Sequence, residues 1–459
     1  MVEFRLYQLK DRMKGEILQG PPSLSFHKFN IDSRLSEPGE LFFALVAERN
    51  GHDFIAQAAD KGASGAVISK KIIPPFNDFA LIKVPNTLEA LQKLAQSTLS
   101  DHPVKVVGIT GSIGKTTTKE FTSALLEQRF KVLKSESNFN NHLGLPLSVL
   151  RLRDDHEIAV LEMGMSHRGE IKILTQIAPP DVAVITNVQP VHLEFLKNMD
   201  NIADAKKEIL EGMKPAGTAV LNGDDPWVNK IVSSWKGEKI FFGLSKRCDI
   251  SAQNIHKTGL EGMQFELNYG EQIKNVVLPS FYDSTLLNFL AAVAVAYAFS
   301  IPIEDITERS AQLKPTAKRG TVFLLEKDLT LIDDSYNSNP AALESTLKSV
   351  SELPAKRKIA VLGDMLELGE DSVKYHVSAG KRIVDNGFDL LATVGPLSKH
   401  MAEGARERGM PQDRIHIFKD SREASKNLGD LLEHGDLILV KGSRSMRMEY
   451  IIEQLKEEG

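Results

Sequence analysis

Short hydrophobic runs alternate with segments of helical spacing through the middle of the chain. Apolar residues dominate positions 104–109, 158–163, 182–188 and 218–221, and apolar positions recur every three or four residues in most of the segments between them. Runs of this length are typical of strands buried on both faces, and the spacing between them predicts amphipathic helices. The alternation therefore predicts a mainly parallel sheet that helices cover on both faces.

The last third of the chain repeats this pattern. We expect strands at 329–332, 358–362, 390–394, 415–418 and 437–440, with helical stretches between them. Such an order predicts a second, doubly wound α/β domain of the Rossmann-like type. In both domains, ligands are expected beyond the carboxyl ends of the parallel strands.

The beginning of the chain differs, because short apolar runs there mix with turn residues. We expect a strand at 41–46 and a helix at 54–60. Pro85-Asn86-Thr87 is a capping sequence for a helix that starts near Leu88, and Lys314-Pro315 marks a second boundary. The fold class is thus α/β with three domains: a small N-terminal domain (1–84), a central P-loop domain (85–313) and a C-terminal domain (314–459).

Residues 108–118, Gly-Ile-Thr-Gly-Ser-Ile-Gly-Lys-Thr-Thr-Thr, form the most specific motif. A predicted strand precedes them and a segment of helical spacing follows, which is the context of a phosphate-binding P-loop. The strict spacing has glycine six residues before the lysine, whereas this chain has Ile109 there and glycines at 108, 111 and 114. The alternative is a tight turn between a strand and a helix.

Within this loop, backbone N–H groups and the helix N-terminus would bind phosphate oxygens. We expect Lys115 to reach the β- and γ-phosphates and the Thr116 hydroxyl to bind Mg²⁺. The predicted nucleotide-binding residues of the loop are Gly108, Ile109, Thr110, Gly111, Ser112, Ile113, Gly114, Lys115, Thr116 and Thr117.

Three ionisable residues follow predicted strands of the central domain. Glu162 ends one strand, where a carboxylate beside a P-loop can bind the metal of the nucleotide; a helix-capping or solvent-facing glutamate is the alternative. His192 follows another strand and could be a ligand, a base or an ordinary loop histidine. Spacing alone favours a solvated helix face for the pair Lys206 and Lys207.

Polar loops also follow three strands of the C-terminal domain, at 333–340, 363–369 and 441–445. The first is rich in polar and turn residues and ends at Pro340, a residue that favours the first turn of a helix. We expect the three loops to face one side of the domain and to form part of a site. Ordinary connections between strands and helices are the alternative.

Composition restricts the partners. The chain has 459 residues, 42% of them hydrophobic and 25% charged, and a net charge of −5. Without a basic excess, nucleic acid is not expected as a ligand. The single cysteine, Cys248, and an N-terminus without a signal-peptide layout indicate a cytoplasmic protein. The apolar run at 286–299 is too short for a transmembrane segment and predicts a buried helix.

Taken together, the motifs resemble those of the Mur ligase family. Residues 110–117, 162–164, 187–192, 205–206, 222–226 and 333–340 occur in the family's order. The segments 32–34, 38–44, 51–54, 362–369 and 441–444 are most similar to members that add D-Ala-D-Ala, and the Asn-Pro-Arg sequence of the diaminopimelate-adding member is absent. The resemblance covers all three predicted domains.

This resemblance implies an activity and a ligand for each domain. The N-terminal domain would bind the UDP end of UDP-MurNAc-tripeptide, the central domain ATP and Mg²⁺, and the C-terminal domain D-Ala-D-Ala. The reaction would form ADP, phosphate and UDP-MurNAc-pentapeptide through an acyl phosphate, in the last cytoplasmic step of peptidoglycan precursor synthesis. We expect a monomer, and the sequence leaves open whether lysine or diaminopimelate is the third residue of the stem peptide.

The resemblance also implies roles for individual residues. A second Mg²⁺ would be held by Glu162, His192 and a carbamylated Lys206, which with Lys115 form the predicted catalytic set. Further nucleotide contacts would come from Asn288, Arg319, Asp334, Tyr336, Asn337 and Asn339. Contacts to the UDP substrate would come from Ser33, Arg34, Phe42 and Asn141.

Two other functions stay open at this point. One is another amide ligase of the same superfamily, either a different Mur step or a folylpolyglutamate-type enzyme. The other is a P-loop regulatory switch or transport ATPase, in which the polar loop at 333–340 would have no role.

Overall fold

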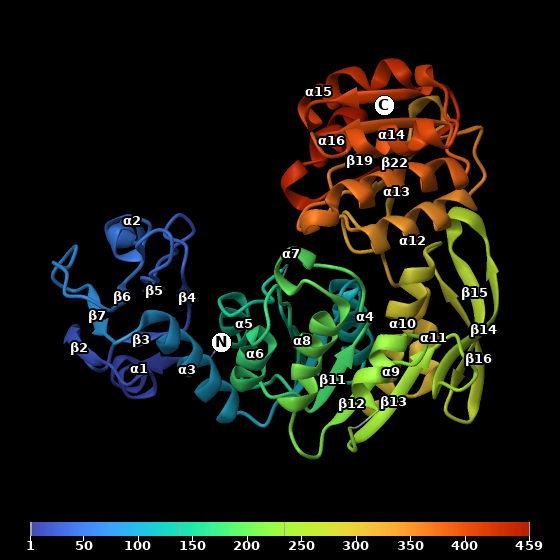
Figure 1. The fold of residues 1–459 in the computed structure, drawn as a ribbon. Coiled ribbons are helices and arrows are strands. Elements are labelled where there is room, and N and C mark those ends of the chain that lie inside the picture. Colours follow the sequence, from blue (N-terminus) through green and yellow to red (C-terminus); the bar gives the residue numbers. More distant parts are fainter. Residues whose placement is uncertain (1, 137, 234, 459) are drawn as a thin grey trace.

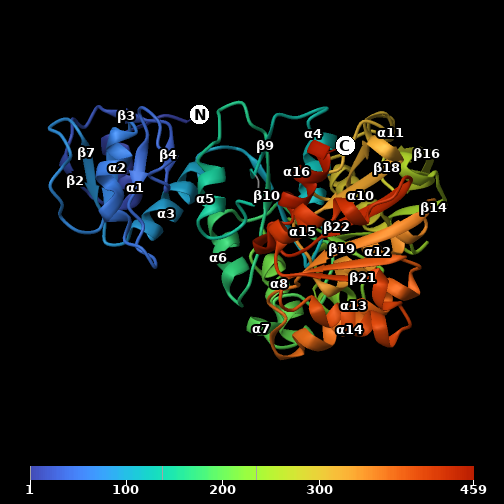
Figure 2. The ribbon, with the colours of Figure 1, turned by 90° about the horizontal axis from the view of Figure 1, so that it is seen from above.

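The computed structural model describes residues 2–136, 138–233 and 235–458 (Figure 1). In this part of the chain, three large sheets follow one another in sequence order, with five, nine and six strands. The N-terminal sheet lies beside the central one, and the C-terminal sheet lies on another side of the central domain, apart from the N-terminal sheet (Figures 1 and 2). The three-part α/β architecture expected from the sequence is therefore confirmed.

The N-terminal sheet mixes parallel and antiparallel pairs in the order β2-β7-β6-β5-β4. Its strands are β2 (Glu16–Gln19), β4 (Phe29–Asn30), β5 (Leu41–Phe43), β6 (Gly65–Ile68) and β7 (Ala80–Lys83), and β1 (Phe4–Arg5) pairs separately with β3 (Ser25–Phe26). The helices are α1 (Leu6–Met13) and α2 (Ile55–Asp60). The strand predicted at 41–46 is shorter than expected, and the helix predicted at 54–60 begins one residue later.

Helix α3 (Thr87–Ser100) joins the first sheet to the second. The Asn86 side chain caps it by accepting hydrogen bonds from the N–H groups of Leu88 (2.9 Å) and Glu89 (3.2 Å). Buried residues of α3 and α1 belong to the same hydrophobic cluster as central-domain residues such as Leu145 and Ile171. The predicted cap is therefore confirmed, and the core runs without a break through α3.

The central sheet has the order β16-β15-β14-β13-β12-β11-β8-β10-β9 and is parallel from β9 to β14. Its strands are β8 (Lys105–Thr110), β9 (Val132–Lys134), β10 (Ile158–Glu162), β11 (Val182–Ile185), β12 (Thr218–Asn222), β13 (Glu238–Gly243), β14 (Ile250–Lys257), β15 (Met263–Tyr269) and β16 (Gln272–Leu278). Its helices are α4 (Lys115–Leu126), α5 (Gly144–Val149), α6 (Glu170–Ile177), α7 (Leu193–Leu196), α8 (Met199–Glu211), α9 (Pro226–Val232), α10 (Asp283–Ala298) and α11 (Ile303–Ser310). The four predicted strands are present, and β9 and β13–β16 extend the sheet beyond the prediction.

Helix α10 is the buried helix that the apolar run at 286–299 predicted. Residues 288–296 are all buried, and the Phe289 ring meets that of Phe121 from α4 edge-on, with 6.4 Å between centroids. Within the described residues, no helix has both the length and the apolar character needed to cross a membrane.

The C-terminal sheet has the order β17-β18-β22-β19-β20-β21, and only its edge strand β17 is antiparallel. The strands are β17 (Thr321–Leu325), β18 (Leu329–Asp334), β19 (Arg357–Gly363), β20 (Leu390–Val394), β21 (Ile415–Phe418) and β22 (Asp436–Lys441). The helices are α12 (Pro340–Ser351), α13 (Ser372–Asp385), α14 (Lys399–Glu407), α15 (Ser421–Asn427) and α16 (Glu449–Glu458). Separate hydrophobic clusters on the two faces confirm the doubly wound arrangement.

The central and C-terminal domains interlock at their junction. Phe281 and Tyr282 follow β16 in the chain, yet they are buried in the hydrophobic cluster of the C-terminal domain. Gly320 has a φ of +82°, and a Cβ there would collide with the Tyr282 ring. The Lys257 ammonium lies 2.6 Å from carboxylate oxygens of both Asp283 and Glu352. Asp283 is the first residue of α10, and Glu352 directly follows α12.

Candidate active site

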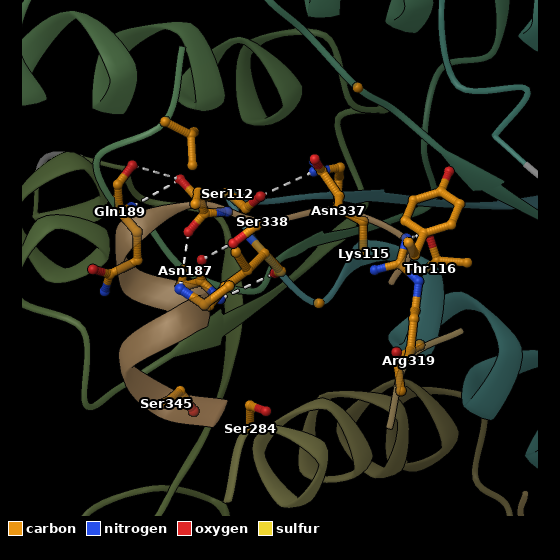
Figure 3. Close-up of a pocket in the computed structure, with 18 of the residues that line it drawn as sticks. Ser112, Lys115, Thr116, Asn187, Gln189, Ser284, Arg319, Asn337, Ser338 and Ser345 are labelled. Atoms are coloured by element: carbon orange, nitrogen blue, oxygen red, sulfur yellow. Dashed lines mark hydrogen bonds between the residues drawn. The ribbon is translucent and has the colours of Figure 1, made fainter. Parts of the chain in front are cut away.

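A cavity of about 1000 Å³ lies between the carboxyl ends of the central strands and the polar loops of the C-terminal domain (Figure 3). All three loops expected to face one side contribute to it, so that expectation is confirmed. The predicted site residues that line it are Ser112, Ile113, Gly114, Lys115, Thr116, Thr117, Asn141, Glu162, His192, Asn288, Arg319, Asp334, Tyr336, Asn337 and Asn339.

The P-loop is hydrogen-bonded to the loop after β11. Asn187 accepts the Ser112 N–H on its backbone carbonyl (3.0 Å) and the Ile113 N–H on its side-chain oxygen (3.1 Å). Gly114 has a φ of +86°, and a Cβ there would collide with the side-chain oxygen of Asn288, which packs against the loop. Figure 3 shows Ser112, Asn187 and Gln189 close together at one end of the cavity.

Lys115 is the first residue of α4, and its side chain folds back over the P-loop. Its ammonium donates to the carbonyl oxygens of Gly111 (2.7 Å) and Ser112 (3.3 Å). Burial lowers the pKa of Lys115, the nearby carboxylate of Glu162 opposes that shift, and the charge of Arg319 adds to it. A partly buried ammonium whose hydrogen bonds with the described residues all go to carbonyl groups is suited to an anionic ligand such as phosphate.

Glu162 is buried at the end of β10, and its two carboxylate oxygens have different partners. Oε2 accepts the Thr116 hydroxyl (2.9 Å), and Oε1 accepts the Asn140 side-chain amide (2.8 Å). Hydroxyl and carboxylate oxygens are the ligands that Mg²⁺ prefers, so this pair fits a nucleotide-bound magnesium ion. Among the described residues, no three His, Cys, Asp or Glu side chains converge as a metal cluster. Further ligands would have to come from phosphates, water or a modified side chain.

His192 lies at the N-terminus of α7, where it lines the cavity with a left-handed backbone (φ +53°). Its Nδ1 is 2.6 Å from Oε2 of Glu367, which comes from the C-terminal loop at 363–369. Burial lowers the pKa of His192, and the charges of Lys115 and Lys206 lower it further, whereas Glu367 raises it.

Lys206 does not lie on a solvated helix face. Its side chain is buried within α8 behind the cavity wall, and it has no hydrogen bond or ion pair with the described residues. Burial and the charge of Lys115 lower its pKa well below the usual value. The neighbouring Lys207 keeps 34% of its side chain exposed, and its ammonium lies 4.0 Å from a carboxylate oxygen of Glu211. The structure therefore separates two lysines that the sequence could not tell apart.

The C-terminal domain supplies a cation and an ion pair to the cavity. Arg319 donates to the Thr116 hydroxyl (3.2 Å), as Figure 3 shows, and its guanidinium lies 4.0 Å from the Tyr336 ring centroid. Asp334 accepts from the Lys441 ammonium (2.6 Å) and the Thr346 hydroxyl (2.9 Å). Arg319 therefore connects Thr116, next to the P-loop lysine, with Tyr336 of the polar loop at 333–340.

Other predicted site residues lie away from the cavity. Gly108, Ile109, Thr110 and Gly111 are behind its wall, and the proposed UDP contacts Ser33, Arg34 and Phe42 are in the N-terminal domain. Ser33 donates to Gln57, Arg34 pairs with Asp32, and Phe42 is only 2% exposed. Asn141 lines the cavity and also caps α5 through the N–H of Gly144.

Sequence reasoning missed several residues of the cavity. Asn140 and Gln189 contact the predicted carboxylate and the P-loop, and Glu367 and Lys441 come from the C-terminal loops. These residues belong to the loop at 187–192, to the C-terminal loops at 363–369 and 441–445, or, for Asn140, to the segment before α5. Their position after strand ends was the available signal, but it did not indicate which side chain would face the cavity.

Comparison with known proteins agrees with this geometry. Residues 109–296 match the model of the Mur ligase middle domain, and residues 318–444 match that of the Mur ligase glutamate ligase domain. The UDP-N-acetylmuramoyl-tripeptide--D-alanyl-D-alanine ligase of Bacillus subtilis (strain 168) is 36% identical over 434 residues, which cover 94% of this chain and 93% of that protein. The chain belongs to the Mur ligase family.

Solved Mur ligase structures share its whole architecture. MurF from Acinetobacter baumannii matches with a TM-score of 0.91 and 29% identity, over 100% of this chain and 99% of that one. MurF ligase from Thermotoga maritima, solved in complex with ADP, matches with a TM-score of 0.82 and 32% identity, over 94% and 97% of the two chains. The small N-terminal domain, which neither domain model covers, is thus part of the similarity.

Proposed function

We propose that this Mur ligase uses ATP to join D-Ala-D-Ala to UDP-MurNAc-tripeptide, releasing ADP and phosphate. The observation that carries the proposal is the cavity in which the P-loop, Glu162 and His192 face the three polar loops of the C-terminal domain. A site between two domains can hold a nucleotide on one side and an acceptor on the other. The relatives matched over nearly their whole length are named for this reaction.

The chemistry explains why cations surround this cavity. A carboxylate is a poor acyl donor, so its attack on the γ-phosphate first produces an acyl phosphate and ADP. The neutral amine of the dipeptide then attacks the carbonyl carbon, the C–N bond forms, phosphate leaves with the electron pair and the amine loses a proton. Lys115 and Arg319 supply positive charge where the phosphoryl oxygens gain negative charge.

Metal binding belongs to the same proposal. Thr116 and Glu162 would hold one Mg²⁺, and Glu162, His192 and a carbamylated Lys206 would hold a second. Bound Mg²⁺ supplies charge that draws the phosphate and the substrate carboxylate together. A buried lysine without an anionic partner fits the modification, because CO₂ reacts with the neutral amine and burial favours that form.

The remaining contacts are proposed by position. Asn288, Asp334, Tyr336, Asn337 and Asn339 would contact ATP from α10 and the C-terminal loop. The UDP end would bind at Ser33 and Arg34 of the N-terminal domain. We propose that this domain ends at residue 84 and that the central domain ends at residue 313. Phe42 could touch the uridine only if the N-terminal core opened, because its ring is buried there. The nucleotide-sugar substrate leads us to infer a cytoplasmic reaction.

Phosphate release from ATP tests this function directly. The purified protein is given ATP and Mg²⁺ with UDP-MurNAc-tripeptide, D-Ala-D-Ala, both or neither, and the products are separated by chromatography. We expect phosphate release and UDP-MurNAc-pentapeptide only when both substrates are present. Turnover with a folate polyglutamate substrate would refute the assignment and favour another amide ligase. ATP hydrolysis at the same rate with and without the muramoyl substrate and the dipeptide would refute it and favour a P-loop switch or transport ATPase.

A further inference from the structure

A histidine–carboxylate pair connects the central and C-terminal domains at the edge of the cavity. Nδ1 of His192 and Oε2 of Glu367 are 2.6 Å apart, although 175 positions separate them in the sequence. His192 lies where α7 begins, and Glu367 lies in the loop after β19. The pair therefore exists only while the two domains hold this relative position.

The backbone is constrained at both ends of this contact. Both residues have left-handed backbones, with φ of +53° at His192 and +61° at Glu367. Side chains with a Cβ seldom adopt this conformation unless the surrounding structure holds them in it. The two turns also pack against each other, since a Cβ on Gly369 would touch the Cα of Glu194 at 3.4 Å.

The contact also determines which imidazole nitrogen is available. A carboxylate accepts a hydrogen bond from Nδ1–H, which leaves Nε2 as the nitrogen that can bind a cation. Histidine ligands of metals generally have such a partner, which fixes the ring orientation and the tautomer. The ring lines the same cavity as Lys115 and Glu162.

We propose that Glu367 is a positioning residue for His192, through which the placement of the C-terminal domain orients the imidazole toward the metal site. The inference rests on the proposed role of His192 as a metal ligand. It adds that the second metal site is complete only when the C-terminal domain is seated. Glu367 contacts neither metal nor substrate in this account and acts through the histidine alone.

The competing explanation is an ordinary ion pair at a partly exposed interface, with 28% and 49% of the two side chains exposed. Such pairs contribute little to stability and nothing to metal affinity. The two explanations differ in whether the effect of Glu367 passes through His192, which a double-mutant cycle measures.

The test measures Mn²⁺ binding by electron paramagnetic resonance, with β,γ-methylene-ATP and bicarbonate present and neither muramoyl substrate nor dipeptide added. The variants are Glu367→Ala, Glu367→Gln, Glu367→Asp, His192→Ala and the double variant His192→Ala with Glu367→Ala. Glu370→Ala, an exposed glutamate in the same turn, is the matched control. Circular dichroism and thermal unfolding confirm folding, and Glu367→Gln serves as the nearly isosteric variant if Glu367→Ala fails to fold.

We expect the weaker Mn²⁺ site of Glu367→Ala to lose about 10- to 100-fold in affinity. Glu367→Gln and Glu367→Asp keep an acceptor oxygen and should recover part of that loss, and Glu370→Ala should match the wild type. Glu367→Ala should add no loss in the His192→Ala background. An equal loss in that background, unchanged affinity in Glu367→Ala, or a wild type that binds a single Mn²⁺ would overturn the proposal. Because no turnover is needed, a failed ligase assay would leave this result standing.

Discussion

Two lysines of the site differ in how strongly their environments oppose the charged ammonium form. Lys115 donates to two carbonyl groups and has the charge of Glu162 nearby, so its ammonium form is partly stabilised. Lys206 has no such partner, and the charge of Lys115 adds to the effect of burial. One lysine is suited to a phosphate and the other to reaction with CO₂.

Replacing Lys115 should therefore remove most of the activity. We expect Lys115→Ala to lower kcat by about 100- to 1000-fold or more, because developing charge on the γ-phosphoryl oxygens loses a preorganised cation. Steady-state phosphate release measures the effect, and an unchanged thermal unfolding curve shows that the variant is folded. Near-normal kcat in a folded variant would remove the P-loop assignment.

Replacing Lys206 should act on kcat more than on the KM for ATP. The proposed second metal acts on the reacting carboxylate and not on nucleotide affinity. We expect Lys206→Ala to be nearly inactive and to regain activity when small carboxylates such as acetate are added. Lys207→Ala, at the half-buried neighbouring lysine of the same helix, is the matched control. Wild-type activity in Lys206→Ala, or an unmodified ammonium in a high-resolution map of the liganded enzyme, would contradict the carbamate.

Site residues were predictable where their position next to a strand end or a glycine-rich loop indicated their function. Lys115, Thr116 and Glu162 follow strands and a glycine-rich loop, and the structure brings them together in one cavity. The partner of His192 was not predictable, because residue spacing does not show how the turns of two domains meet. The burial of Phe42 was not predictable either, because residue spacing does not show that its short strand is buried on both faces.

At the scale of elements, predictions succeeded where a strand is short, apolar and followed by a helix. The bounds of β20 and β21 match the predicted 390–394 and 415–418. The antiparallel strands β15 and β16 were missed, because the prediction relied on continuous apolar runs separated by helices. Polar and apolar residues alternate along β15, and no helix separates it from β16. The edge strand β17 was missed for the same lack of a following helix.

Helix α3 offers a test of local stability outside the cavity. Asn86→Ala removes the side-chain oxygen that satisfies the N–H groups of Leu88 and Glu89. We expect a loss of about 1 kcal/mol in the free energy of unfolding, measured with chemical denaturant, and an unchanged kcat. Asn86→Asp and Asn86→Ser keep a capping oxygen and should retain most of the stability. Equal losses in all three variants would argue against the cap.

At the scale of the whole molecule, the site depends on the placement of the C-terminal domain. Arg319 reaches Thr116, and Glu367 reaches His192, so residues from both domains form its wall. The N-terminal domain lies apart from the C-terminal one, beyond α3 (Figure 1). Ligands that bind across these junctions should change how the domains sit.

Limited proteolysis measures this change. We expect ATP and UDP-MurNAc-tripeptide each to alter cleavage near residues 85 and 314, because closure buries backbone that is otherwise accessible. The Lys115→Ala variant should show a weaker response to ATP and the same response to the UDP substrate. Identical cleavage patterns with and without saturating ligands would show that the domains do not move.

The aromatic pair at the central–C-terminal junction has a consequence for dissecting the enzyme. Phe281 and Tyr282 precede the predicted boundary at 313, but they complete the hydrophobic cluster of the following domain. A fragment cut at 314 would lose both rings from the cluster that they share with Leu343, Leu347 and Ile332. The hydrophobic cluster of the C-terminal domain is therefore discontinuous in sequence, and we expect a stable excised C-terminal fragment to need either the aromatic segment supplied as a peptide or polar replacements in the cluster.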